Sequence, residues 1–316
     1  MTDYILLVAA VILLCLSLNK LSGKIGVPML LAFILLGMLF GTDGILKIPF
    51  DNFEIAEQVC SISLIFIMFY GGFGTSFKQA RPVAGRAVLL STAGVFLTAL
   101  LVGLFCHYLL HFEFLESMLI GAVISSTDAA SVFSILRSKR LNLKYNTASM
   151  LEVESGSNDP CSYMMTVIIL TVMSGKFSGG ELVWMIFAQL VFGICVGVLV
   201  ALGAAFILKK VQFATDGFDT IFVFCMALVA YALASLLGGN GYLSTYIAGI
   251  ILGNQPLTNK KSLVHFFDGI TGLMQMLIFF LLGLLATPSE LPAVLLPAAL
   301  IMLFMTVIAR PAAAAA

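Results

Sequence analysis

The chain has 316 residues, of which 61% are hydrophobic and only 10% are charged. Soluble domains carry charge on about a quarter of their residues, so this composition excludes an ordinary soluble domain and predicts a polytopic membrane protein. The 16 basic and 16 acidic side chains cancel, which argues against nucleic acid or another strongly charged surface as the partner.

Cutting the apolar runs at glycine, proline and charge clusters predicts eleven membrane-spanning helices. They are expected near residues 3–20, 27–41, 55–76, 84–110, 115–137, 145–173, 181–208, 218–237, 241–254, 262–286 and from 291 to the end. The chain begins Met-Thr-Asp without a basic region or a small-residue cleavage site, so the first run is interpreted as a transmembrane helix rather than a signal peptide. The cysteines show no CxxC spacing, which favours buried apolar packing over disulfides or zinc ligands.

The basic residues predict the orientation, because lysine and arginine collect in cytoplasmic loops. Thirteen of the 16 follow odd-numbered helices: Lys20, Lys24, Lys78, Arg81, Arg86, Arg137, Lys139, Arg140, Lys144, Lys209, Lys210, Lys260 and Lys261. Only Lys47 and Lys176 lie in the opposite loops, so we expect the N-terminus outside the cell inner (plasma) membrane and the basic loops in the cytoplasm. Arg310 belongs to neither set, since it lies inside the last apolar run.

Two pairs of segments suggest an internal repeat, although matches between short apolar strings also arise by chance. The run from Gly26 resembles the run from Gly241, and LIFIMFYGG from Leu64 resembles LIFFLLG from Leu277. Partners seven helices apart cross the membrane in opposite directions, as in the inverted repeats of secondary transporters. The same offset places partners of the fifth and sixth helices beyond residue 316. We therefore expect a transporter cut short, with the alanines at 312–316 uninformative.

Four carboxylates lie inside predicted spans rather than in loops: Asp128, Glu152, Glu154 and Asp159. A charge at the bilayer centre costs about 2.5–3.5 kcal/mol even on the lenient insertion scale, so such residues usually line a polar pathway. A polar cluster that only holds helices together is the structural alternative.

Helical spacing arranges the polar residues of 154–159 in two stripes. Ser155 and Asp159 form one i,i+4 pair, and Glu154 and Asn158 form the other. Asp128 lies at a similar depth in the preceding antiparallel helix, so we expect an oxygen cage at the membrane midplane. Gly156 and Pro160 in the sixth helix, and Ser-Ser-Thr-Asp in the fifth, favour local unwinding there.

The ligand types indicate the chemistry. Hydroxyl, carbonyl and carboxylate oxygens without histidine or cysteine suit a hard cation and not zinc or copper. Because desolvation favours the protonated carboxyl group, one carboxylate can hold either a proton or a cation. Mutual exclusion at that site is enough to couple their exchange, and no resident cofactor is expected.

The strings SSTDAASV at 125–132 and ESGSNDP at 154–160 resemble bacterial sodium or potassium:proton antiporters of the NhaP type, particularly the CvrA-like potassium:proton antiporters. The resemblance covers the whole chain. It implies an all-α fold of thirteen helices in inverted repeats, and a homodimer. It also implies a core domain, near 55–173 and 262–311, that moves against dimerisation helices near 1–41 and 181–254.

Carried over by position, the resemblance implies that Asp159 binds cation or proton and that Asp128, Thr127 and Ser155 complete the site. The Asn158-Asp159 pair is the one usual in electroneutral members and implies one cation for one proton. The resemblance also pairs Glu154 with an arginine of the eleventh helix, which explains Arg310. A cytoplasmic regulatory domain beyond residue 316 is a further implication. One departure is that Phe69, Tyr70 and the two glycines after them replace an acidic residue that many relatives carry in the third helix.

The leading hypothesis is therefore exchange of a monovalent cation for a proton by alternating access, not an enzyme activity. Potassium is favoured by the resemblance alone, and a sodium:proton antiporter of the same fold stays open. A cation channel fits poorly because a filter is usually a symmetric ring of repeated groups. An intramembrane aspartyl protease using Asp128 and Asp159 lacks the Tyr-Asp and Gly-Leu-Gly-Asp signatures of that class.

Overall fold

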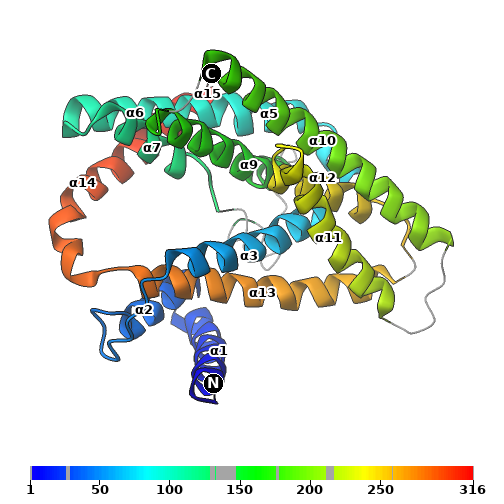
Figure 1. Ribbon diagram of the computed structural model, residues 1–316, viewed down its shortest axis with the longest axis horizontal. Coiled ribbons are helices and arrows are strands. Elements are labelled where there is room, and N and C mark those ends of the chain that lie inside the picture. Colours follow the sequence, from blue (N-terminus) through cyan, green and yellow to red (C-terminus); the bar gives the residue numbers. More distant parts are fainter. Residues whose placement is uncertain are drawn as a thin grey trace. The chain divides into compact units, whose positions relative to one another are not determined.

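The structure is a computed structural model that describes residues 2–25, 29–128, 132, 147–175, 178–210, 217–257 and 259–315. Within these residues every regular element is a helix and no strand is present (Figure 1). The long α-helices are α1 (Thr2–Ile25), α2 (Met29–Phe40), α3 (Phe53–Gly74), α9 (Thr147–Met173), α10 (Gly179–Lys210), α11 (Phe218–Leu236), α12 (Gly241–Gly253) and α13 (Lys260–Leu285).

Two further spans contain a π-turn. The first consists of α5 (Ala84–Leu89), η1 (Leu90–Gly94) and α6 (Val95–Leu110). The second consists of η3 (Pro288–Glu290), α14 (Leu291–Phe304), η4 (Met305–Ala309) and α15 (Arg310–Ala315). The shorter helices α4 (Phe77–Ala80) and α7 (Phe114–Ile124) complete the described elements. Of these, only α4 and the single turn η3 lie outside the predicted spans.

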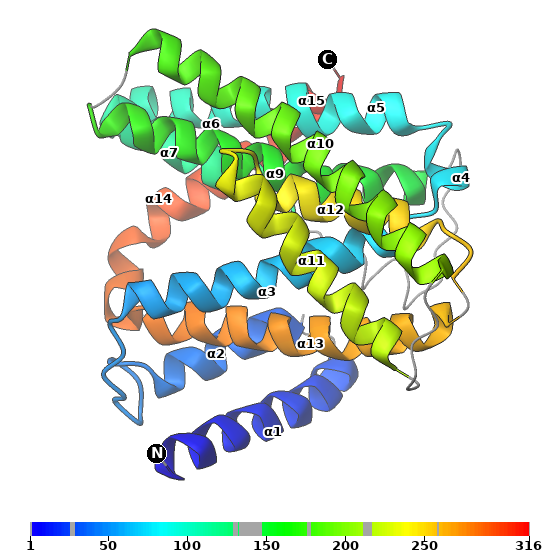
Figure 2. The same cartoon turned by 45° about the vertical axis from the view of Figure 1, so that its right-hand side comes forward.

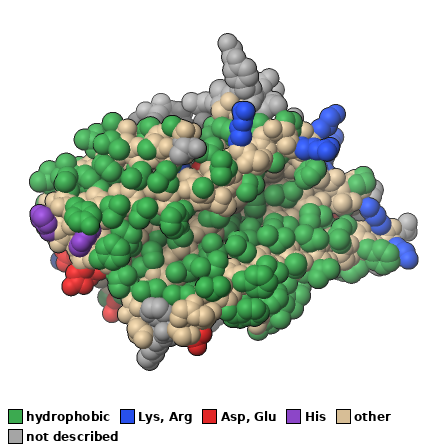
Figure 3. Space-filling model, turned by 90° about the horizontal axis from the view of Figure 1, so that it is seen from above, with side chains coloured by type: hydrophobic (Ala, Val, Ile, Leu, Met, Phe, Trp, Pro, Cys, Tyr) green, Lys and Arg blue, Asp and Glu red, His purple; other side chains and the backbone are tan. Residues whose placement is uncertain are grey.

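The apolar lengths identify a multi-pass membrane protein. Six helical stretches of the described chain are long and apolar enough to cross a bilayer, and four shorter apolar helices accompany them. Hydrophobic side chains cover most of the molecular face drawn in Figure 3. Apolar side chains on the outside of a helical protein are what lipid tails solvate.

The predicted spans agree with the helices to within about five residues, apart from the fifth. The sequence predicts a continuous helix over 115–137, whereas α7 ends at Ile124 and residues 125–128 are not helical. The hydroxyl of Ser125 donates to the carbonyl oxygen of Ala122 at 2.7 Å, so a side chain replaces a helical partner. The remainder of that predicted span lies outside the described residues, except for Val132. The unwinding expected in the fifth helix is confirmed.

The unwinding expected in the sixth helix is wrong, because α9 stays helical through Gly156 and Pro160. Proline removes a donor from the helix interior, and neighbouring polar groups stabilise the turn around it. The side-chain amide of Asn240 donates to the carbonyl oxygen of Pro160 at 3.0 Å. This bond anchors the turn that follows Pro160, whereas the carbonyl that loses its helical donor is that of Gly156.

The chain divides into two compact units. One comprises residues 1–67 and 264–295, and the other comprises 68–263 and 296–316. In the first unit, buried side chains of α2 and α13 form one apolar cluster that includes Phe33, Phe40 and Phe280. The proposed division into core and dimerisation helices stays a prediction.

A loop of the first unit is anchored by Asp43, whose carboxylate accepts hydrogen bonds from the hydroxyl and the backbone N–H of Ser289. These bonds to the ionised form lower the pKa of Asp43.

Helix packing supports the internal repeat. In the first unit α2 packs closely on α13, where a Cβ on Gly37 would strike the backbone of Phe280. In the second unit α12 packs equally closely on the end of α3, where a Cβ on Gly253 would strike the backbone of Phe73. The sequence pairs α2 with α12 and α3 with α13, so each contact is the repeat partner of the other. The inverted repeat predicted from the sequence therefore has a counterpart in the packing.

These glycine contacts make a first testable prediction. Gly249→Ala should destabilise the protein by about 1–3 kcal/mol, the cost typical of overpacking, because the added methyl group would meet the backbone of Phe69 and Phe73. Gly203→Ala in α10 is the matched control, since nothing lies within 4 Å of its Cβ position. Thermal unfolding of the purified variants in detergent measures both. Equal melting temperatures would contradict the close packing of α12 on α3.

Candidate cation site

The site is built where the fifth span is interrupted. α7 ends at Ile124, and helical bonding resumes where the N–H of Val132 donates to the carbonyl oxygen of Asp128 at 3.1 Å. α9 runs beside α7 in both views (Figures 1 and 2). The buried hydroxyl of Ser162 on α9 donates to the carbonyl oxygen of Ala122 at 2.6 Å. The broken end of α7 is therefore fixed to the helix that carries the second motif.

A polar network joins the two motifs. The hydroxyls of Thr127 and Ser155 lie 3.0 Å apart, and the amide of Asn158 donates to Thr127 at 2.7 Å. The same amide nitrogen lies 3.2 Å from Oε1 of Glu154, one helical turn away, as the spacing predicts. Ser155 and Asn158 are completely buried. Four of the residues predicted for the site are thus in one connected group.

Arg310 reaches this network from the last span. Its Nη1 lies 3.4 Å from Oε1 of Glu154, and its Nη2 donates to the carbonyl oxygen of Ser125 at 2.6 Å. The structure therefore contains the ion pair that the resemblance implies. Arg310 also binds the interrupted segment of the fifth span, because the carbonyl of Ser125 lies at the end of α7.

The two aspartates predicted for the site differ in their surroundings. Asp159 is partly buried, and its carboxylate is hydrogen-bonded by the side chain of Ser126. Asp128 is exposed, and its carboxylate lies close enough to interact electrostatically with Asp159. The described contacts bring Ser126 and Asp128 of the interruption to Asp159, on the helix that also carries Ser155. Their roles in binding an ion stay predictions.

One buried oxygen of the network lacks a hydrogen-bond donor. The side-chain carbonyl oxygen of Asn158 has no partner among the described residues, although its amide nitrogen has two. Buried acceptors are nearly always satisfied in native proteins, and an exception calls for an explanation such as an ion or a water molecule. The arrangement therefore offers an oxygen to a small cation or to water.

Sequence reasoning missed several residues that position the site. Ser162 continues the polar stripe of α9, since it lies four residues after Asn158 and seven after Ser155; this spacing was a usable signal. Ser126 belongs to the SSTDAASV motif, but the pattern gave it no role. Asn240 caps α12 through Leu243 N–H at 3.0 Å and also bonds Pro160, a contact between distant segments that no local pattern reveals.

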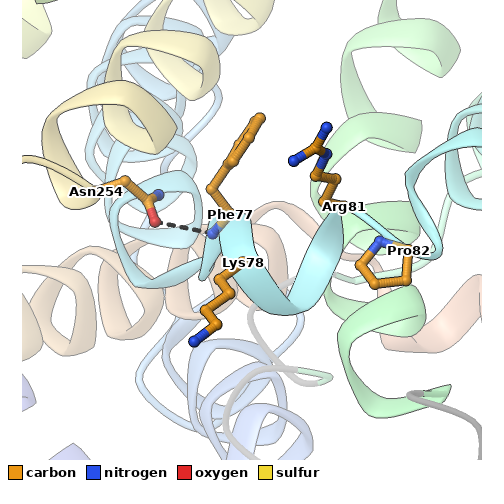
Figure 4. A pocket seen from close by; sticks show the side chains of 5 residues that line it. All are labelled: Phe77, Lys78, Arg81, Pro82 and Asn254. Atoms are coloured by element: carbon orange, nitrogen blue, oxygen red, sulfur yellow. Dashed lines mark hydrogen bonds between the residues drawn. The ribbon is translucent and has the colours of Figure 1, made fainter.

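A separate pocket of about 510 Å³ is lined by Phe77, Lys78, Arg81, Pro82 and Asn254 (Figure 4). Its charged side chains are both basic and point away from one another, and the amide oxygen of Asn254 accepts the N–H of Phe77 at 2.8 Å. Two positive charges disfavour a cation there. The network on α9 is therefore the better candidate for cation binding.

Comparison with known proteins identifies the family. The transmembrane sodium/hydrogen exchanger family matches residues 7–316. The chain belongs to this family. Its similarity to the K(+)/H(+) antiporter NhaP2 of Shewanella baltica is 35% identity over 302 residues, which cover 94% of this chain and 51% of that protein. Its similarity to the K(+)/H(+) antiporter NhaP of Alkalimonas amylolytica is 36% identity, covering 98% of this chain and 54% of that protein.

The fold is also that of a solved antiporter. The sodium proton antiporter MjNhaP1 from Methanocaldococcus jannaschii superposes with a TM-score of 0.85 at 27% identity, covering 99% of this chain and 77% of that chain. The predicted fold class and the resemblance to NhaP-type antiporters are confirmed. The chain spans about half the length of the curated relatives it matches.

Proposed function

We propose that the protein exchanges a monovalent cation for a proton across the membrane by alternating access, with Asp159 holding the cation and the proton in turn. The observation that carries this proposal is the buried network around Thr127, Ser155 and Asn158, where the carbonyl oxygen of Asn158 is left without a donor among the described residues. The relatives named as antiporters support it.

The interruption of the fifth span adds a second attraction for a cation. The last carbonyl groups of a helix carry a partial negative charge, equivalent to about half an electron, and have no helical partners. α7 ends at the site, so its terminal dipole is directed toward the interruption, where the Arg310 guanidinium already bonds the carbonyl of Ser125. Broken helices whose ends coordinate ions are typical of secondary transporters. This geometry favours a cation over an anion at Asp159.

Exchange follows from competition for one carboxylate. A proton and a cation cannot occupy Asp159 together, so each must leave before the other binds. Asn158 is neutral where a second carboxylate would add charge, which favours one cation for one proton. The proposal includes no enzymatic step and no resident cofactor.

The cation, the assembly and the location are parts of the same proposal. We favour potassium because the relatives from Shewanella baltica and Alkalimonas amylolytica are named K(+)/H(+) antiporters. Sodium is the second candidate because the superposed structure is named a sodium proton antiporter. We place the protein in the inner membrane as a homodimer, with the N-terminus outside and the basic loops in the cytoplasm. A cytoplasmic regulatory domain beyond residue 316 belongs to the same proposal.

The direct test is cation-driven proton movement in liposomes. The protein is reconstituted with a pH-sensitive dye inside, and potassium, sodium, lithium or choline chloride is added outside. We expect alkalinisation of the lumen with potassium, a smaller or equal response with sodium, and none with choline. Insensitivity to valinomycin-imposed voltage would support electroneutral exchange. Equal responses to all four salts would contradict the proposal.

A further inference from the structure

Tyr246 is a buried residue whose hydroxyl the proposed exchange does not use. It lies in the middle of α12 and is 2% exposed. Its ring packs on α9 at Gly156, where a Cβ would lie 2.7 Å from the hydroxyl oxygen. Its backbone packs on α3 at Gly72, where a Cβ would strike the carbonyl oxygen of Tyr246. The contact at Gly72 therefore positions the backbone of Tyr246, and the contact at Gly156 positions its ring.

The ring of Tyr246 lies on the face of α9 that carries the carboxylates of Glu152 and Asp159. Glu152 precedes Gly156 by four residues and Asp159 follows it by three, so all three share one side of the helix. Both carboxylates interact electrostatically with the Tyr246 hydroxyl. The phenol therefore lies on the same side of α9 as Asp159 and comes from α12, whereas Ser126 comes from the interruption of the fifth span.

The hydroxyl makes no hydrogen bond of normal geometry with the described residues. The side chain of Thr75 lies close enough to interact with it, but because the Thr75 hydroxyl donates its proton to the carbonyl oxygen of Gly71 at 3.0 Å, it does not also donate to the phenol oxygen, whose lone pairs stay available. Leaving a buried hydroxyl unsatisfied costs about 1–3 kcal/mol. A phenylalanine would fill the same space on Gly156 without that cost, so ring packing alone does not account for the oxygen. Such a hydroxyl, held rigidly near a carboxylate, is suited to a partner that arrives from outside.

The contact with Tyr246 explains why residue 156 is a glycine. Any side chain at this position would displace the ring of Tyr246, because the hydroxyl and the ring carbon that bears it lie within 2.7 Å of the Cβ position. Because Gly156 has no side chain, the phenol ring of Tyr246 packs directly on the surface of α9. The absence of a side chain is needed for the approach and not for backbone flexibility, since α9 is helical there.

We infer that Tyr246 is a further residue of the cation site, whose hydroxyl oxygen becomes a ligand of the cation held by Asp159. This inference rests on the proposed function. The hydroxyl supplies an oxygen from α12, in addition to the oxygens of the Ser126 and Thr127 segment. The ligand class is a dehydrated monovalent cation, for which neutral hydroxyl oxygens and one carboxylate are suitable donors.

The test is Tyr246→Phe in the reconstituted protein, which removes one oxygen and keeps the ring against Gly156. The KM for potassium should rise about tenfold, the change expected when a hydrogen bond or ligand of a charged group is lost. The maximal rate should stay within about twofold of the wild type. Tyr242→Phe is the matched control, because this buried tyrosine one turn away packs on Tyr163 and Tyr231 and should leave KM unchanged.

A second variant keeps the inference testable. Gly156→Ala pushes the hydroxyl away from α9 and should also raise KM, whereas Gly203→Ala should not. Potassium-dependent thermal stabilisation of the purified variants should weaken in the same order, which gives a readout independent of transport. A KM for Tyr246→Phe within twofold of the wild type, or a fall in rate at constant KM, would overturn the inference. Absence of exchange by the wild-type protein would instead contradict the proposed function.

Discussion

Asp159→Asn is expected to abolish cation-coupled proton movement, with residual flux at the level of empty liposomes. Asparagine has nearly the same shape and can keep a hydrogen bond to Ser126, which bonds Asp159 in the wild-type protein. It cannot bind or release a proton, and it offers a cation a neutral oxygen in place of a charged one. Because both halves of the exchange use this carboxylate, loss of either function removes the coupled cycle.

Everted membrane vesicles with an acid lumen provide the measurement, since dequenching of a pH-sensitive amine on salt addition reports exchange. Asp51→Asn is the matched control: this aspartate lies in the loop before α3 and is exposed, so its variant should exchange at the wild-type rate. Expression and melting temperature of Asp159→Asn should match or exceed those of the wild type, because a desolvated charge is removed. Retained exchange in the Asp159→Asn vesicles would rule out the assigned role.

Periodicity and composition were sufficient to predict most of the helices of the fold. Apolar runs bounded by glycine, proline and charge predicted α9, α10 and α11 to within two residues, because a lipid-exposed helix must be apolar for nearly its whole length. The same reasoning failed to separate the two candidate breaks. Ser125 and its neighbours unwind the fifth span, whereas Pro160 leaves α9 intact. At Pro160, α9 is anchored by a hydrogen bond from Asn240, a residue distant in the sequence, and no local pattern indicates that contact.

The contacts of the candidate site were likewise only partly predictable from the sequence. The bond between Glu154 and Asn158 follows from i,i+4 spacing on one helix, and it was predictable from the sequence. The contact of Tyr246 with Gly156 joins segments ninety residues apart, and no local pattern in either segment indicates it. A glycine in a polar motif suggests flexibility when the sequence is read alone. In the structure it marks the close approach of an aromatic ring.

Arg310 connects the stability of the protein to the geometry of the site. Its guanidinium binds both Glu154 and the carbonyl of Ser125, so one side chain holds both the motif of α9 and the end of α7. The π-turn η4 immediately precedes it, and such a turn inserts one residue and rotates the rest of the helix. The position of the guanidinium thus depends on an irregular helix in the last span. Removing it should affect folding before it affects ion selectivity.

Arg310→Ala is accordingly expected to destabilise the protein by about 1–3 kcal/mol, the cost of leaving buried polar groups without a partner. The side chains of Glu154 and Arg310 are 11% and 26% exposed, so water replaces the lost cation only in part. The melting temperature of Arg310→Ala in detergent should fall by several degrees. The melting temperature of Arg310→Lys should fall less, because lysine keeps the charge but not the forked geometry. Adding Glu154→Gln to Arg310→Ala should recover part of the loss, because the stranded charge is then absent. If the single and double variants melt at the same temperature, Arg310 acts through packing or through Ser125 and not through Glu154.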